Sequence, residues 1–208
     1  MSTPNLTQIK NLNKDTNLLM KICSQIANAM LYLESLNHIH KDLSCKNCII
    51  NINNNEISIK VCDLSRYMYS YRNDYCILLT NTQQSIRLRH TAWETICTGQ
   101  FTSKSDVWSF GLIIFELLTS CKQLAYEELS DEQLIQLVNS TYQQQQQQQY
   151  CHQQQISLNY LVKEYLIKQS SIDEFKSSGN SKLVDLMFDC LNLNVFDRPN
   201  FNDINLLS

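Results

Sequence analysis

The sequence predicts a mainly α-helical domain with one small β-hairpin. Apolar residues recur at three- and four-residue steps between 16 and 36, which is the period of an amphipathic helix. Residues 106–119 are apolar on nearly all sides, which indicates a helix buried in the middle of a domain. Only two short runs have the composition of strands, too few for a sheet-based fold. With 208 residues, of which 43% are hydrophobic, the chain can form one domain with a sizeable core.

The first part of the chain is predicted to form a tail, a long helix and the hairpin. We expect residues 1–15 to be an N-terminal tail and residues 16–36 to be the helix, with Asp15 or Thr16 as its N-cap. Two strand-like runs follow a polar connection. They cover residues 48–52 and 57–62, and the turn-forming residues Asn53 to Asn55 join them.

The second part of the chain alternates helical patterns with irregular segments. Residues 63–94 show no sustained period, so we expect a long loop. A disordered, low-complexity, glutamine-rich insertion is expected at about 141–155, because such a tract cannot build a packed core. Besides the buried helix, the pattern predicts a surface helix over 131–140, helices over 157–168 and 181–192, and a last helix after Pro199.

Composition and charge exclude several classes of function. The net charge of −3 offers no basic surface for nucleic acid or acidic lipid, so neither is expected as a partner. The longest apolar stretch, Phe110 to Phe115, is broken by Glu116 and is too short to span a membrane. Nine cysteines without a signal-peptide pattern predict reduced thiols and a cytoplasmic location. Cys45 and Cys48 form a C-x-x-C pair, but no second pair at zinc-like spacing accompanies it, which favours two ordinary thiols over a metal site.

The polar connection from His40 to Asn47 is the segment whose side chains are best suited to catalysis or metal binding. Its carboxylate Asp42 lies five residues before the carboxamide of Asn47, in a loop between a helix and a strand. The hairpin returns the chain so that Asp63 can lie beside Asn47. Carboxylate and amide oxygens suit Mg²⁺, which takes few protein ligands together with phosphate oxygens. Asp42 would remain available to accept a proton from an attacking hydroxyl.

These residues resemble the C-terminal lobe of the eukaryotic protein kinase family. The catalytic-loop pattern H-R-D-L-x-x-x-N is matched by HKDLSCKN, with Lys41 in place of arginine. Further elements follow in the family's order, so the resemblance covers residues 16–208. They are Asp63-Leu64-Ser65 for D-F-G, Ala92-Trp93-Glu94 for A-P-E, the buried-helix signature Ser105 to Gly111, and Asp197-Arg198-Pro199 for the late R-P element.

The resemblance implies a role for each residue of the catalytic loop and its surroundings. Asp42 would be the catalytic base, and Asn47 and Asp63 would bind Mg²⁺. Ile49 would lie under the adenine ring of ATP. Lys46, four residues after Asp42 where tyrosine kinases place an arginine, favours the tyrosine-kinase-like branch weakly. The tyrosines at 67, 69, 71 and 75 lie in the segment that family members phosphorylate, although surface or packing roles explain them as well.

The resemblance also implies structural roles. His40 and Leu64 would be the lower members of the regulatory spine. Asp106, inside the buried helix, needs a partner there and would hold the backbone of the catalytic loop. Glu94 and Arg198 would form a buried ion pair that ties the activation segment to the helical lobe.

Departures from the family pattern predict an inactive protein. The three glycines, Gly99, Gly111 and Gly179, are too far apart to form a glycine-rich loop. Residues 1–15 are too few for an N-terminal lobe, so the lysine that holds the ATP phosphates and its glutamate partner are missing. We expect a truncated, catalytically inactive kinase-like protein that either binds a protein partner or is a relic of gene duplication. Mg²⁺ and ATP are the cofactors that the family implies. The alternatives are an active protein kinase, if the missing lobe comes from elsewhere or the chain is a fragment, and an unrelated helical binding domain.

Overall fold

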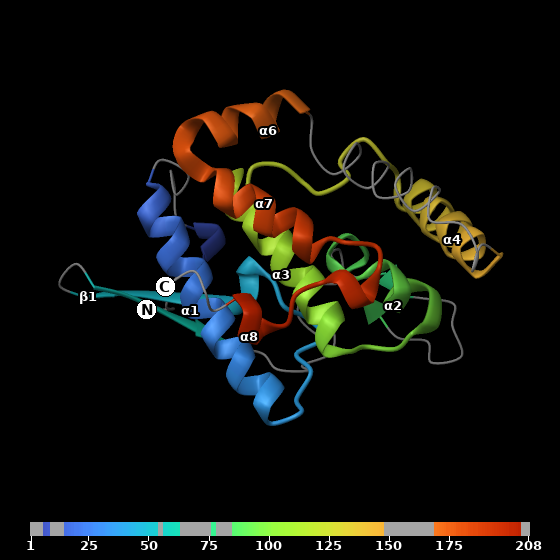
Figure 1. Ribbon diagram of the computed structural model, residues 1–208, viewed down its shortest axis with the longest axis horizontal. Helices are drawn as coiled ribbons and strands as arrows, with labels where there is room; N and C mark the ends of the chain where they lie inside the picture. The colour runs from blue at the N-terminus through green and yellow to red at the C-terminus, as the bar shows by residue number, and fades with distance from the viewer. Residues whose placement is uncertain are drawn as a thin grey trace.

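The protein is mostly helical, and one buried helix organises it. The computed structural model describes residues 6–8, 15–53, 56–62, 76–77, 85–147 and 169–204. Helix α3 (Ser103–Leu118) runs through the centre, between α1 (Thr16–Ser35) and α7 (Ser181–Cys190) (Figure 1). Nearly every residue of α3 is buried. The prediction of a buried central helix is therefore confirmed.

Helix α1 begins where the sequence predicts. The Oδ1 atom of Asp15 accepts hydrogen bonds from the backbone N–H groups of Asn17 (3.0 Å) and Leu18 (3.2 Å), so Asp15 is the N-cap. The apolar stripe of the helix packs into the core, and Leu19, Ile22 and Ile26 are fully buried. No described helix is long and apolar enough to cross a bilayer.

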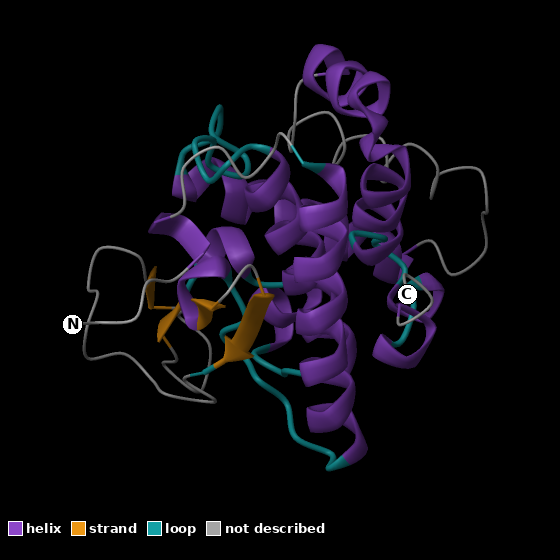
Figure 2. Ribbon diagram, turned by 90° about the vertical axis from the view of Figure 1, so that its left-hand side faces the viewer, coloured by secondary structure: helices purple, strands orange, loops and turns teal. Residues whose placement is uncertain are grey.

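The hairpin consists of β1 (Cys48–Asn53) and β2 (Glu56–Val61), paired antiparallel with Cys48 opposite Val61. Figure 2 shows the strands at one side of the helical body. The side chain of Gln25 in α1 fastens β2 to that body, because its Nε2 donates to the Ile57 carbonyl and its Oε1 accepts from the Ile59 N–H, both at 2.8 Å. The predicted hairpin is confirmed, and β1 begins directly after Asn47, the last residue of the polar connection.

The segment that was expected to be one long loop contains more structure. A two-residue ladder pairs β3 (Cys76–Ile77) with β4 (Ser85–Ile86), and a 3₁₀ turn covers Leu88–His90. Helix α2 (Trp93–Thr98) follows. Its C-cap is Gly99, whose φ of 71° lies in the left-handed region. These elements are shorter than the windows in which periodicity can be recognised, which is why the sequence pattern missed them.

Helix α4 (Asp131–Gln147) is longer than predicted. It continues beyond residue 140 into the glutamine-rich tract, so the expectation of an irregular insertion is wrong for residues 141–147. Glutamine loses little rotamer freedom in a helix, so a glutamine tract can extend a helix that has already begun. Residues 148–155 and the helix expected over 157–168 lie outside the described residues.

The last part of the chain packs on α3. Helix α6 (Gln169–Phe175) leads into α7 through Lys176–Asn180, where the chain kinks at Gly179 (φ 90°). Helix α8 (Phe201–Ile204) follows Pro199 as expected. Helix α7 lies very close to α3 at Gly111. A Cβ added there would come within 2.9 Å of the Cβ of Cys190 and of Leu191 Cγ, so this crossing requires glycine.

The beginning of the chain is not a simple tail. Residues Leu6–Gln8 form a 3₁₀ turn that contacts β1 and the turn at Cys45–Asn47. Leu6 is fully buried in the core. One leucine carries too little periodicity to be recognised from sequence, so the expectation of a tail over 1–15 is wrong at this position.

Candidate active site

Helix α3 holds the connection between α1 and β1, which we call the catalytic loop (residues 38–47), through the carboxylate of Asp106. Its Oδ2 accepts the backbone N–H of His40 (2.7 Å) and its Oδ1 accepts that of Lys41 (3.0 Å). Lys41 has a φ of 72°, a left-handed conformation that needs such support. Asp106 is only 2% exposed. Burial raises the pKa of Asp106 to about 6, and the two N–H donors oppose that rise.

A second carboxylate on α3, Glu116, holds the other end of the catalytic loop. Its Oε2 accepts the backbone N–H of Cys45 (3.1 Å), and its Oε1 lies 3.0 Å from Nε2 of His90. Burial opposes ionisation of Glu116, but His90, the Cys45 N–H and Arg87 outweigh it and bring its pKa to about 2. Sequence reasoning noted Glu116 only as the residue that interrupts an apolar run, and that interruption was the available signal.

The side chains of Asp42 and Asn47 meet inside the loop. The Nδ2 atom of Asn47 donates to the Asp42 carbonyl (2.7 Å) and to the Asp42 Oδ2 atom (3.1 Å). The Nη1 atom of Arg87 lies 3.8 Å from the other carboxylate oxygen of Asp42 and also donates to the hydroxyl of Ser44. Arg87 is buried and comes from the segment before α2, so it fixes that segment beside the candidate base. Nothing in the sequence pattern had singled out Arg87.

His40 links the catalytic loop to the end of β2. Its Nδ1 accepts the backbone N–H of Asp42 (3.3 Å), so Nε2 is the atom that donates to the carbonyl of Cys62 (3.0 Å). The backbone N–H of Cys62 in turn donates to the Asn47 carbonyl (2.9 Å). Cys62 directly precedes Asp63, which together with Leu64 lies outside the described residues.

Asn47 suits a divalent cation by the chemistry of its side chain. Because Nδ2 is used toward Asp42, the amide oxygen is the atom that would face a cation, and Mg²⁺ prefers such oxygens. Ile49, the residue expected under an adenine ring, lies in β1 opposite Lys60 and is partly exposed. Cys45 and Cys48 are buried free thiols.

Glu94 and Arg198 form a two-pronged ion pair. Arg198 Nη1 lies 2.7 Å from Glu94 Oε1, and Nη2 lies 2.8 Å from Oε2. The guanidinium also donates to the carbonyls of Asn192 (2.7 Å) and Lys104 (3.0 Å). The side chain of Arg198 is fully buried. The pair therefore connects α2 to the segment before α8, 104 residues further along the chain.

Comparison with known proteins identifies the family. The family model described as protein tyrosine and serine/threonine kinase matches residues 6–164. The chain belongs to the protein tyrosine and serine/threonine kinase family. The matched segment begins at Leu6, the buried residue of the 3₁₀ turn, and includes both α3 carboxylates.

Three relatives to which the chain is similar carry the word receptor in their names. The chain is 36% identical over 119 residues to the epithelial discoidin domain-containing receptor 1 of Homo sapiens, covering 57% of this chain and 12% of the receptor. It is 36% identical over 132 residues to the NT-3 growth factor receptor of Homo sapiens, covering 58% and 15%. It is 29% identical over 132 residues to the discoidin domain-containing receptor tyrosine kinase B of Caenorhabditis elegans, covering 64% and 16%. The chain thus spans less than a fifth of the length of these relatives.

Proposed function

We propose that this 208-residue chain is a kinase-like C-terminal lobe that does not transfer phosphate by itself and acts by binding another protein. The proposal rests on a contrast between a catalytic loop that is held in place and a lid over the phosphates that this chain cannot form. The catalytic loop is held at His40, Lys41 and Cys45 by two buried carboxylates of α3. The 208 residues nevertheless contain no cluster of glycines that could form a lid over phosphates.

The side chains of the loop support one half of a phosphoryl-transfer site. Asp42 can accept the proton of an attacking hydroxyl, and the hydrogen bond from Asn47 orients its carboxylate. Asn47 fits Mg²⁺, and Asp63 is the second oxygen ligand that the resemblance supplies. Bound Mg²⁺ would neutralise charge on the phosphates of ATP. The lysines of the loop, Lys41 and Lys46, follow the family's loop positions and do not replace the lysine of the other lobe.

The missing contacts act on the rate multiplicatively. Kinases work mainly by positioning the phosphoryl group and stabilising its charge. Each 1.36 kcal/mol lost from the transition state lowers the rate about tenfold. Loss of the phosphate-binding lysine and of the lid removes several such contacts, so transfer by the isolated chain is expected to fall below detection.

Titration with nucleotide tests this proposal. The ¹⁵N-labelled chain is titrated with ATP and Mg²⁺ while the side-chain amide signal of Asn47 is followed by NMR. We expect an affinity weaker than the range of about 1 µM to 1 mM that enzymes show for substrates. Saturable micromolar binding of ATP that is weakened in Asn47→Ala would overturn the premise of the proposal, that the chain lacks the contacts that hold the phosphates of ATP.

A second candidate is an active protein kinase whose nucleotide-binding half is supplied by other residues. The observation in its favour is the complete set of loop contacts at Asp106, Glu116 and Asn47. Sequencing the transcript upstream of the Met1 codon distinguishes the two. An open frame that encodes a glycine-rich loop and a strand lysine would favour the active kinase.

The residue type that an active form would phosphorylate and the cellular compartment are also proposals. Relatives that carry the words receptor tyrosine kinase in their names favour tyrosine over serine and threonine as the acceptor of any active form. We propose a cytoplasmic location, supported by the seven cysteines with described side chains, which are all free thiols.

A further inference from the structure

Two cysteines that are far apart in the sequence meet beside the catalytic loop. Burial raises the pKa of the Cys45 thiol, and a side-chain hydrogen-bond contact with the Cys121 thiol raises it further. The two sulfur atoms are therefore neighbours. Cys45 belongs to the catalytic loop, and Cys121 lies just after the end of α3.

Glu116 of α3 holds the backbone of both cysteines. Its side-chain Oε2 accepts the N–H of Cys45 at 3.1 Å, and its backbone carbonyl accepts the N–H of Cys121 at 2.6 Å. One residue of the central helix thus fixes the chain on both sides of the thiol pair. The contact between the two sulfur atoms is therefore built into the fold.

The chain takes an unfavourable backbone conformation where it reaches Cys121. Ser120 has a φ of 52° and Cys121 has a φ of 55°, so two successive residues with side chains lie in the left-handed region. This conformation costs free energy for any residue that has a Cβ atom. Strained residues of this kind cluster at functional sites. Here the strained turn carries Cys121 from the end of α3 to the catalytic loop.

The two thiols differ in their access to solvent. Cys121 is half-buried and is followed by the exposed residues Lys122 and Gln123, whereas Cys45 is fully buried. A small oxidant in solution therefore meets Cys121 first, and the Cys45 thiol is already in contact with it. A solvent-accessible cysteine with a second cysteine beside it is the arrangement that redox sensors use.

We propose that Cys45 and Cys121 form a reversible redox site, which a peroxide converts into a disulfide that ties the catalytic loop to the end of α3. Hydrogen peroxide first oxidises the Cys121 thiol to a sulfenic acid and releases one water. The Cys45 sulfur then attacks the sulfenic sulfur. The S–S bond forms, and the hydroxyl group leaves with the Cys45 proton as a second water.

The overall step is balanced by the peroxide. The two thiols lose two protons and two electrons, and one hydrogen peroxide becomes two waters. A thiol reductant reverses the reaction, as expected for a transient disulfide in a reducing compartment. The bond would restrain the loop that carries Asp42 and Asn47. The proposal does not depend on phosphate transfer or on ATP binding.

Tryptic peptides identify the linked cysteines. The full chain is treated with hydrogen peroxide, free thiols are blocked with N-ethylmaleimide in urea, and the protein is digested without reductant. Cleavage after lysine and arginine leaves Cys45 as the only cysteine of peptide 42–46 and Cys121 as the only cysteine of peptide 105–122. By mass spectrometry we expect these two peptides to be joined. The joined species should disappear with dithiothreitol and in Cys121→Ser.

Thermal unfolding tests whether the bond restrains the fold. A disulfide that closes a long stretch of chain stabilises the folded protein, so peroxide treatment should raise the Tm by roughly 5–15 °C. Dithiothreitol should reverse the rise, and Cys121→Ser should lack it.

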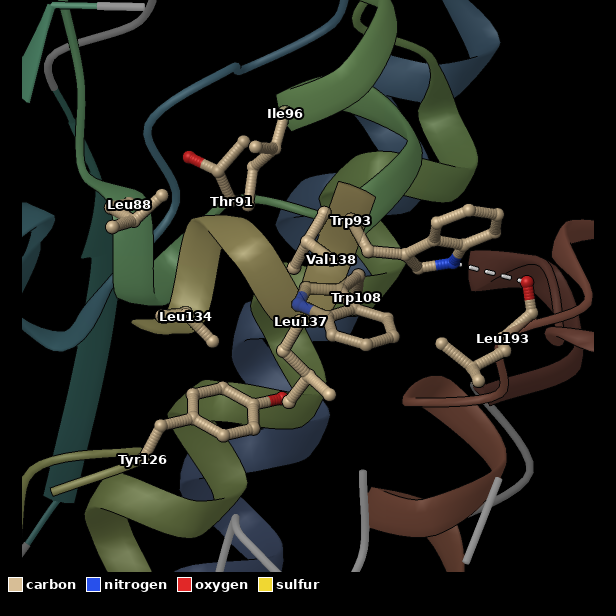
Figure 3. A pocket seen from close by; sticks show the side chains of 10 residues that line it. All are labelled: Leu88, Thr91, Trp93, Ile96, Trp108, Tyr126, Leu134, Leu137, Val138 and Leu193. Atoms are coloured by element: carbon tan, nitrogen blue, oxygen red, sulfur yellow. Dashed lines mark hydrogen bonds between the residues drawn. The ribbon is translucent and has the colours of Figure 1, made fainter. Parts of the chain in front are cut away.

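Cys97→Ser is the matched control. Cys97 is a partly buried cysteine of α2, and its thiol contacts the side-chain oxygen of Asn139 at 3.6 Å. Its neighbours Trp93 and Ile96 face a small apolar hollow whose described lining contains no cysteine (Figure 3). The control should therefore keep both the joined peptides and the rise in Tm.

Three results on the unmodified chain would overturn the proposal, whether or not Cys121→Ser folds. The first is a Cys45 that carries the N-ethylmaleimide label while Cys121 is a sulfinic acid. The second is a Cys121 that is joined to a different cysteine. The third is a joined pair that leaves the Tm unchanged.

Discussion

Replacing Arg198 by methionine should destabilise the protein strongly. Methionine retains much of the apolar stem of arginine but removes the guanidinium, which makes two short hydrogen bonds to Glu94. The carbonyls of Asn192 and Lys104 also lose their donor. Glu94 has only 15% of its side chain exposed, so its charge would remain largely buried without a partner.

The expected loss in the free energy of unfolding follows from the burial of the Glu94–Arg198 pair. Removing one partner of a buried ion pair costs about 3–5 kcal/mol. A domain of this kind is stable by only about 5–15 kcal/mol. Arg198→Met should therefore remove a large fraction of the free energy of unfolding. Replacing both partners, as in Glu94→Leu with Arg198→Met, should cost less than the single change because it leaves no unpaired charge.

The assay is urea unfolding followed by circular dichroism at 222 nm. Lys176→Met is the matched control, since Lys176 pairs with Asp185 at 3.2 Å on the surface with exposed fractions of 44% and 60%. Exposed pairs contribute about 0–1 kcal/mol, so the control should hardly change the midpoint. A loss below about 1 kcal/mol for Arg198→Met would refute the reasoning that this pair holds α2 to the end of the chain.

Three further predictions concern other buried groups of the protein. The pKa of Glu116 is lowered from 4.5 to about 2, so its stabilisation is present above pH 4.5 and is lost as the pH falls toward 2. Glu116→Gln should thus lose roughly 3 kcal/mol at pH 7 and show a flatter stability profile between pH 4.5 and 2 in acid titration, and an unchanged profile would contradict this. Burial raises the pKa of Cys23 to about 12, so iodoacetamide at pH 8 should label it far more slowly in the native than in the urea-unfolded protein, as mass spectrometry can show. Gly111→Ala places a Cβ 2.9 Å from that of Cys190 and should cost about 1–3 kcal/mol in thermal unfolding, and an unchanged Tm would show that α3 and α7 can separate freely.

Long periodic elements could be predicted from the sequence. Helix α1, the hairpin and the buried helix α3 lie where the patterns place them, because each has enough residues for its period to show. The short helix α2 and the buried Leu6 were missed because their positions depend on contacts with distant residues. The glutamine tract was misjudged up to Gln147 because composition predicts the absence of a core but does not exclude continuation of a helix.

The candidate site was predictable only where a motif named its residues. The loop from His40 to Asn47 and the anchor Asp106 follow the kinase pattern. Glu116, His90 and Arg87 approach the loop from other elements. Their contacts come from tertiary packing, and no local spacing in the sequence encodes such packing.

Phosphate transfer by the 208-residue chain is the most direct measurement of the central claim, that an assembled catalytic loop without phosphate-binding contacts is inactive. The purified chain is incubated with γ-labelled ATP, Mg²⁺ and a peptide mixture that offers tyrosine, serine and threonine. The predicted result is no transfer above that of the Asp42→Asn variant, which keeps the shape of the side chain but cannot act as a base. Transfer that the unmodified chain supports and Asp42→Asn abolishes would contradict the account.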